Sequence, residues 1–132
     1  MIILAHAAAV LVALLGVLHL VYTLHDFGPR PRYFRPSDAR LLETLRTAKT
    51  AIAPNGRDYW SGVLGFNLSH SIGVVLFALL IVIATLHEIV WLKPLLVVVG
   101  ATYGMISYRC WFIVPTVGIF VATALMIVGW SA

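Results

Sequence analysis

Histidines inside apolar segments are the residues of this chain best placed to do chemistry. His19 lies in the apolar run 2–24, and His70 lies in the apolar run 60–86, about one helical turn after Asn67. A neutral imidazole offers one hydrogen-bond donor and one acceptor, and it can also ligate a metal ion. Because polar side chains at membrane depth are costly, each one marks a candidate functional site.

Other polar side chains are expected in the same leaflet as these histidines. As a helical residue, His19 would lie about a turn and a half from the end of its apolar run nearest to residues 25–59, and His70 is expected at a comparable depth in the second run. Several tyrosines, a serine and an arginine fall near the same membrane surface. We therefore predict a polar pocket formed by His19, Tyr22, Asn67, His70, Tyr103, Ser107, Tyr108 and Arg109.

Three uses of this pocket remain open at the level of sequence. His70, with Asn67 and Tyr108, could bind the carbonyl group of a quinone or the headgroup of a lipid. His19 and His70 could instead be the axial ligands of haem b. In the third interpretation, both imidazoles hydrogen-bond neighbouring groups and fix the register of the helices.

Several classes of site are disfavoured. No Asp or Glu lies within a predicted span, which argues against proton-coupled drug export and against carboxylate di-metal bundles. The single cysteine, Cys110, cannot form an internal disulfide. His87 and Glu88 are adjacent, so they do not share a helix face, and a third ligand is missing. Apart from haem, we predict no metal site.

The composition is that of an integral membrane protein. Of the 132 residues, 61% are apolar and only 11% are charged, with a mean hydropathy of +0.99. About a quarter of the residues of a soluble domain are charged. We therefore predict one all-α membrane domain over residues 1–132, with no room for a nucleotide-binding fold or a nucleic-acid module.

The hydropathy pattern predicts a bundle of four transmembrane helices. The last apolar stretch, 95–128, is too long for one crossing, and one helix would put Arg109 near the middle of the bilayer at a cost of at least about 2.5 kcal/mol. A hairpin with Arg109 at the turn and Pro115 in the first turn of the next helix avoids this cost. The predicted spans are 2–24, 60–86, 94–109 and 112–130.

The distribution of basic residues predicts the orientation. Eight of the nine Lys and Arg residues lie in loop 25–59 or at Arg109, and Lys93 is the exception. By the positive-inside rule, the loop and Arg109 are cytoplasmic. We therefore expect a multi-pass protein of a bacterial inner membrane with both termini outside.

The cytoplasmic loop is predicted to contain a proline-rich extended segment and one amphipathic helix. The helix is expected over residues 38–52, with Ser37 as its N-cap and Pro54 after its end. Its leucines would lie in the inner headgroup region, with its cations near anionic lipid. A regulatory partner of this helix is the alternative.

Small residues recur at helical spacing in the predicted spans. Such residues let two helices approach closely, either within the bundle or between subunits. A homo-oligomer or a partner membrane subunit is therefore reasonable. The predicted packing positions are Ser61, Gly65, Ser69 and Gly73 in the second span, and Gly100 and Gly104 in the third.

Two segments resemble a known group of proteins. The segments GFNLSHSIG at residues 65–73 and WFIVPTVGIFVAT at residues 111–123 are similar to the pattern of a group of small bacterial four-helix membrane proteins of unassigned function. The resemblance covers mainly the second and fourth spans. It implies four spans and draws attention to Asn67, Ser69 and His70, but it implies no reaction.

The leading hypothesis is a small non-enzymatic membrane protein, either a homo-oligomer or an accessory subunit. It would bind a lipid- or quinone-like ligand near the inner leaflet and contact anionic lipid through its basic loop. A haem-binding redox protein is the alternative. A channel or porter is least favoured, since no charge is embedded in a span.

Overall fold

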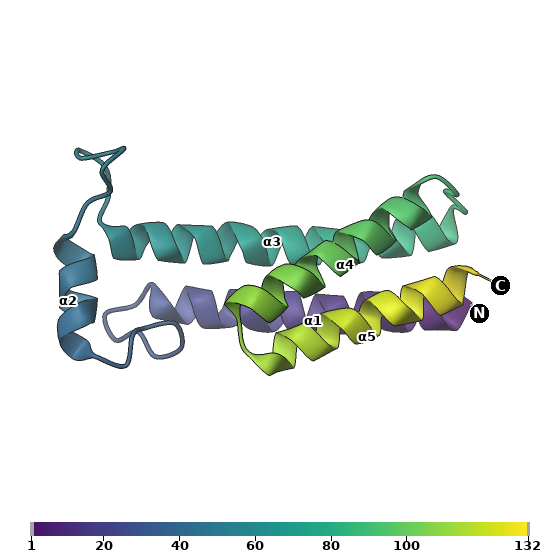
Figure 1. Cartoon of the computed structure of the whole chain (residues 1–132), viewed down its shortest axis with the longest axis horizontal. Coiled ribbons are helices and arrows are strands. Elements are labelled where there is room, and N and C mark those ends of the chain that lie inside the picture. Colours follow the sequence, from purple (N-terminus) through teal and green to yellow (C-terminus); the bar gives the residue numbers. More distant parts are fainter. Residues whose placement is uncertain (1, 132) are drawn as a thin grey trace. The chain divides into compact units, whose positions relative to one another are not determined.

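A computed structural model describes residues 2–131, and five α-helices lie in that range (Figure 1). A short antiparallel bridge between Thr50 and Ala53 lies between the second and third helices. The helices are α1 (Ile2–Asp26), α2 (Ala39–Thr47), α3 (Tyr59–Leu86), α4 (Leu92–Cys110) and α5 (Ile113–Trp130).

Three of the helices in the described range are long and apolar enough to cross a membrane. These are α1, α3 and α5, with 25, 28 and 18 residues respectively. The remaining predicted span, 94–109, corresponds to α4, which has 19 residues but carries Lys93 and Arg109 near its two ends. The chain is therefore a helical membrane protein with three clear candidate spans.

The chain forms two compact units. Unit 1 comprises residues 1–17 and 73–132, and unit 2 comprises residues 18–72. The long helices α1 and α3 each contribute one part to each unit. Loop residues and α2 belong to unit 2, whereas α4 and α5 belong to unit 1.

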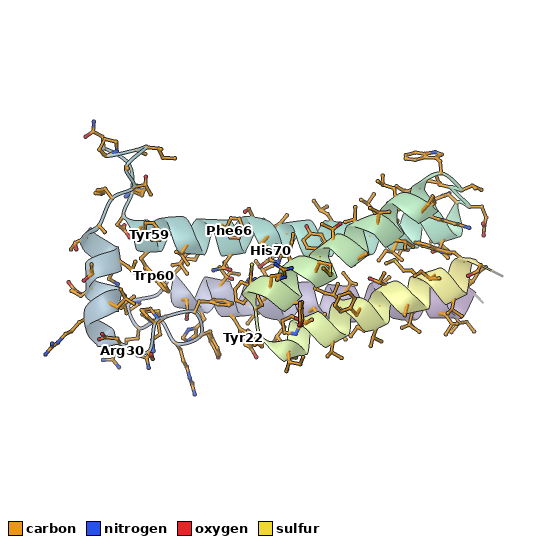
Figure 2. The ribbon with its side chains drawn as sticks, viewed as in Figure 1. Tyr22, Arg30, Tyr59, Trp60, Phe66 and His70 are labelled. Atoms are coloured by element: carbon orange, nitrogen blue, oxygen red, sulfur yellow. The ribbon has the colours of Figure 1, made fainter. Side chains whose placement is uncertain are left out.

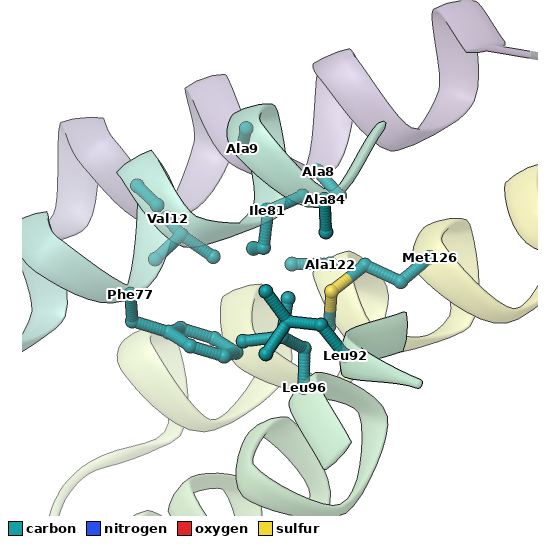
Figure 3. Packing of buried hydrophobic residues seen from close by; sticks show 11 residues of the cluster. Ala8, Ala9, Val12, Phe77, Ile81, Ala84, Leu92, Leu96, Ala122 and Met126 are labelled. Carbon is teal, nitrogen blue, oxygen red and sulfur yellow. The ribbon is translucent and has the colours of Figure 1, made fainter. Parts of the chain in front are cut away.

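In the hydrophobic core of unit 1, α1 contributes small side chains, and the other helices contribute larger side chains together with further alanines (Figure 3). Ala8 and Ala9 are buried beside Ile81, Leu96 and Met126. Alanines keep the backbone of α1 close to its neighbours, because they add little volume at the contact.

Close approach is most evident where α4 packs on α5. An added Cβ atom at Gly100 would lie 2.6 Å from Thr123 Oγ1, and one at Gly104 would lie 2.7 Å from the Phe120 ring. Both glycines therefore lie where α4 and α5 approach closely. The buried hydroxyls of Ser107 and Thr116 also hydrogen-bond across the hairpin at 2.8 Å.

The stretch predicted as a hairpin forms two helices, α4 and α5, with a two-residue connection. Arg109 lies in the last turn of α4, and Pro115 lies in the first turn of α5. Trp111 and Phe112 are in extended conformation between them. The proline costs no hydrogen bond there, because N–H groups in a first helical turn have no intrahelical partner.

The loop helix is shorter than predicted. It ends at Thr47 rather than residue 52, and its N-cap is Asp38, whose carboxylate accepts from the Arg40 backbone N–H at 2.8 Å, rather than Ser37. The next residue, Ala48, is extended, and its carbonyl accepts from the Tyr59 N–H at 2.9 Å. The extended backbone at Ala48 ends α2, and the Ala48 carbonyl bonds to the start of α3 instead of to a following helical turn.

The small-residue ladder of α3 makes different contacts at its different positions. A Cβ atom at Gly65 would meet no other atom within 4 Å, whereas one at Gly73 would lie 3.7 Å from the Tyr103 hydroxyl. Ser61 and Ser69 hydrogen-bond locally, to Asp58 and to the Phe66 carbonyl. The close approach predicted at Gly65 is therefore not made within the described chain, and contact with another subunit there stays a prediction.

Candidate functional site

A histidine–asparagine pair links the two helical segments of unit 2. Nε2 of His19 on α1 lies 3.1 Å from Oδ1 of Asn67 on α3, and Asn67 is buried with 4% of its surface exposed. An amide oxygen only accepts hydrogen bonds, so in this arrangement the imidazole Nε2–H donates. In a neutral imidazole, this assignment makes Nδ1 the acceptor nitrogen of His19.

His70 lies beside this pair, one turn further along α3. Its ring centroid is 5.5 Å from that of His19, and the two rings meet edge to face at 75°. Phe66, labelled with His70 in Figure 2, lies on the same side of α3, its ring nearly parallel to that of His70 with centroids 6.4 Å apart. Two imidazoles and an amide thus converge in unit 2 with an aromatic ring beside them.

A second phenyl ring comes from the loop. The Phe34 ring centroid lies 4.8 Å from the His19 centroid, at an interplanar angle of 43°. We call residues 27–36 the strap, because they return from the end of α1 toward this helix. The strap therefore gives the histidine cluster an aromatic wall that neither long helix provides.

The strap is held by the last residue of α1. The Asp26 carboxylate, fully buried, accepts hydrogen bonds from the backbone N–H groups of Arg32, Tyr33 and Phe34. Prolines at 29, 31 and 36 fix φ at their own positions and disfavour a helical conformation of the residue before each of them, which limits the alternatives open to this bent segment.

A second aromatic contact ties the strap to α1. The rings of Tyr22 and Tyr33 stack at 4.1 Å with an angle of 11°, and the His25 ring meets Tyr33 edge on at 5.1 Å. Tyr22 was predicted to line the pocket. In the structure its partner is Tyr33, one residue before Phe34.

The other four predicted pocket residues belong to unit 1. Tyr103 lies near the Phe77 ring, with centroids 6.0 Å apart, and Ser107 is paired with Thr116. Tyr108 and Arg109 are exposed near the end of α4. The cluster within unit 2 therefore contains His19, Asn67 and His70 from the predicted set, and it gains Phe34 and Phe66, which sequence reasoning missed.

The charges of unit 2 are mostly cationic, and none of its described Lys and Arg side chains forms an ion pair with a carboxylate. Among residues 2–131 the ion pairs are His25 with Asp26 and Lys93 with Glu88. Arg46 and Lys49 instead donate to backbone carbonyls. The backbone N–H and the hydroxyl of Ser61 both donate to Asp58 and lower the pKa of that carboxyl below its usual value.

In the part of the chain that the structure describes, no three His, Cys, Asp or Glu side chains are grouped to hold a metal ion.

Comparisons with protein-family models, with curated proteins and with solved structures find no match to this chain. The resemblance of residues 65–73 and 111–123 therefore stays a prediction.

Proposed function

We propose that the protein binds a lipid- or quinone-like ligand at the cluster of His19, Asn67 and His70. The observation that supports this best is the meeting of two imidazoles and a buried amide from two apolar helices, with phenyl rings on two sides. Ligand sites combine apolar walls with a few placed polar groups. A quinone has both a flat ring that phenyl groups contact and carbonyl oxygens that an imidazole N–H can bind.

The protein would act without a catalytic step of its own, as a homo-oligomer or an accessory subunit. The open surface at Gly62 and Gly65, where an added Cβ would meet nothing within 4 Å, supports contact with another helix. The exposed cations of the loop, without carboxylate partners among residues 2–131, support contact with anionic lipid headgroups.

A ligand-binding experiment tests the proposed site. We expect the purified protein in detergent to bind decylubiquinone. The variant His70→Leu should bind it at least about tenfold more weakly, because losing a hydrogen bond worth about 1.4 kcal/mol of binding free energy raises the dissociation constant by that factor. Equilibrium dialysis measures both affinities. His87→Leu is the matched control, because His87 is an exposed histidine beyond the end of α3. Equal affinity of both variants would contradict the proposal.

Haem binding is the second candidate, favoured by the nearness of the two imidazole rings, whose centroids are 5.5 Å apart. Axial ligation would need a nitrogen of each ring to point at one iron. The bond from His19 Nε2 to Asn67 uses one of these nitrogens. An absorption spectrum of the protein isolated from its own membrane distinguishes the candidates, because a haem bound by two imidazoles absorbs visible light and a lipid or quinone complex lacks that band.

For the topology, we propose four crossings, by α1, α3, α4 and α5, with α2 as an amphipathic helix at the cytoplasmic surface of a bacterial inner membrane. Leu42 and Leu45 of α2 are partly buried, whereas Arg40 and Arg46 are exposed. Four crossings place both termini outside and eight of the nine Lys and Arg residues inside.

Cysteine labelling in intact cells tests this orientation. In a Cys110→Ser background, Arg40→Cys should react with a membrane-impermeant maleimide only after the cells are permeabilised. Trp91→Cys, in the exposed connection between α3 and α4, should react before permeabilisation. The reverse pattern would overturn the orientation, and labelling of both positions from one side would overturn the crossing of α3.

A further inference from the structure

The carboxylate of Asp26 binds three consecutive backbone N–H groups of the strap. Oδ1 lies 2.6 Å from the Arg32 nitrogen, Oδ2 lies 2.6 Å from the Phe34 nitrogen, and the Tyr33 nitrogen is 3.1 and 3.0 Å from the two oxygens. Successive N–H groups that converge in this way form an anion-binding concavity. The two shortest contacts have the length expected of strong, charge-assisted hydrogen bonds.

These hydrogen bonds take the place of the Lys or Arg side chain that usually pairs with a buried carboxylate. Asp26 is fully buried, and its ion pair among residues 2–131 is with the half-exposed His25, at 3.3 Å. No Lys or Arg in that range forms an ion pair with it. The N–H groups of the strap therefore supply much of the stabilisation that a buried carboxylate requires. It follows that the strap and the carboxylate hold each other in one arrangement.

The positions of two aromatic side chains depend on that arrangement. Tyr33 stacks on Tyr22, and the next residue, Phe34, lies against His19. His19 and Tyr22 are three residues apart on α1, so they share a helix face. Two successive strap residues thus contact two neighbouring rings of one face, and both have their backbone N–H bound by Asp26.

We propose that Asp26 is a positioning residue of the ligand site, which acts by holding Phe34 against His19. Its carboxylate does not touch the ligand, and its effect on binding passes through the Phe34 ring. The role of Asp26 in ligand binding rests on the proposed function, whereas its placement of Phe34 does not. The placement of Phe34 and the effect on ligand binding are therefore measured separately.

The first measurement reports the Phe34 ring without any ligand. Phe34 is replaced by 4-trifluoromethylphenylalanine, and its ¹⁹F resonance is recorded in the parent, in His19→Ala and in Asp26→Asn. We expect Asp26→Asn to move the resonance toward the His19→Ala position, because both changes remove the imidazole from beside the ring. Asp26→Glu keeps the carboxylate and should restore at least half of the difference.

Asp38→Asn is the matched control for this measurement. Asp38 also accepts from a backbone N–H, that of Arg40, but at the start of α2. Its substitution should leave the resonance of position 34 unchanged. An unchanged resonance in folded Asp26→Asn, or an equal movement in Asp38→Asn, would overturn the placement of Phe34 by Asp26.

A second measurement uses the unaltered protein, so it decides the case even if Asp26→Asn does not fold. The backbone amides of Arg32, Tyr33 and Phe34 should exchange with deuterium at least about tenfold more slowly than that of Ile52, because bound N–H groups exchange only after local opening. Ile52 is 97% exposed in the same loop. Exchange at equal rates would overturn the proposal.

The third measurement addresses the ligand. In Asp26→Asn the affinity for decylubiquinone should fall about five- to tenfold, the loss expected for one aromatic contact, and Asp26→Glu should recover most of it. If the ¹⁹F resonance moves while the affinity of Asp26→Asn equals that of the parent, the role in the ligand site is overturned. If the parent protein binds no quinone, the proposed function fails for that ligand class, and the ¹⁹F and exchange results still decide the placement of Phe34.

Discussion

The variant Gly100→Leu is expected to lose about 3 kcal/mol of unfolding free energy, near the upper end of the usual cost of overpacking a core. A Cβ atom at this position would lie 2.6 Å from Thr123 Oγ1 and 3.1 Å from Met126 Cε. Thr123 cannot easily turn away, because it is buried and its hydroxyl donates to the Ile119 carbonyl at 2.8 Å. A leucine side chain would therefore force α4 and α5 apart.

Gly65→Leu is the matched control on a different helix. Because an added Cβ there meets nothing within 4 Å, its unfolding free energy should stay within about 0.5 kcal/mol of the parent. Reversible unfolding in mixed micelles measures both variants. Equal losses in the two, or no loss in Gly100→Leu, would contradict the packing of α4 on α5. If Gly65→Leu keeps its fold but changes the oligomeric state, the ladder of α3 contacts another subunit.

The long helices could be predicted because their signal is local. An apolar run of roughly 20 residues must satisfy its backbone hydrogen bonds internally in a membrane, so hydropathy alone indicates a helix. The proline and the arginine near residues 109–115 then locate the hairpin. The end of α2 could not be predicted in this way, because it depends on a hydrogen bond between Ala48 and Tyr59.

The difference between a local sequence signal and a contact between distant residues also explains which members of the histidine cluster could be predicted. His19, Asn67 and His70 were predicted together because each is a polar residue in an apolar run at a similar depth. Phe34 carries no such signal, since a phenylalanine in a basic loop could point anywhere. Its place is set by Asp26, eight residues earlier, through the backbone of the strap. An acid at the end of a span, followed by a proline-rich segment, was the one available sign.

The glycines show how far spacing alone can predict packing. Gly65 and Gly100 both belong to a regular small-residue pattern, yet only Gly100 has close neighbours in the described chain. A small-residue ladder indicates that another helix can approach closely on one face. Which helix packs on that face depends on the arrangement of the whole bundle, and the spacing of small residues carries no information about that arrangement.

The second large effect is expected from Asn67→Leu, which removes the acceptor of the His19 N–H while keeping the number and branching of the side-chain heavy atoms. Asn67 is buried, and its amide oxygen lies 3.1 Å from His19 Nε2. A donor left unsatisfied in an apolar environment costs about 1–3 kcal/mol. We expect a loss of unfolding free energy in that range. Ser69→Ala, on the exposed side of the same helix, should cost less than about 0.5 kcal/mol.

A double-mutant cycle separates the hydrogen bond from the packing of these two residues. If the bond between His19 and Asn67 carries the effect, His19→Leu with Asn67→Leu should cost less than the sum of the single variants, because neither helix then holds an unpaired polar group. Interhelical hydrogen bonds in membranes give coupling free energies of about 0.6 kcal/mol on average and up to about 1.7 kcal/mol. Because His19 also contacts Phe34 and His70, we expect a value in the upper half of that range. Strictly additive losses would show that the two side chains stabilise the protein independently, and the cluster would then not act as one polar site.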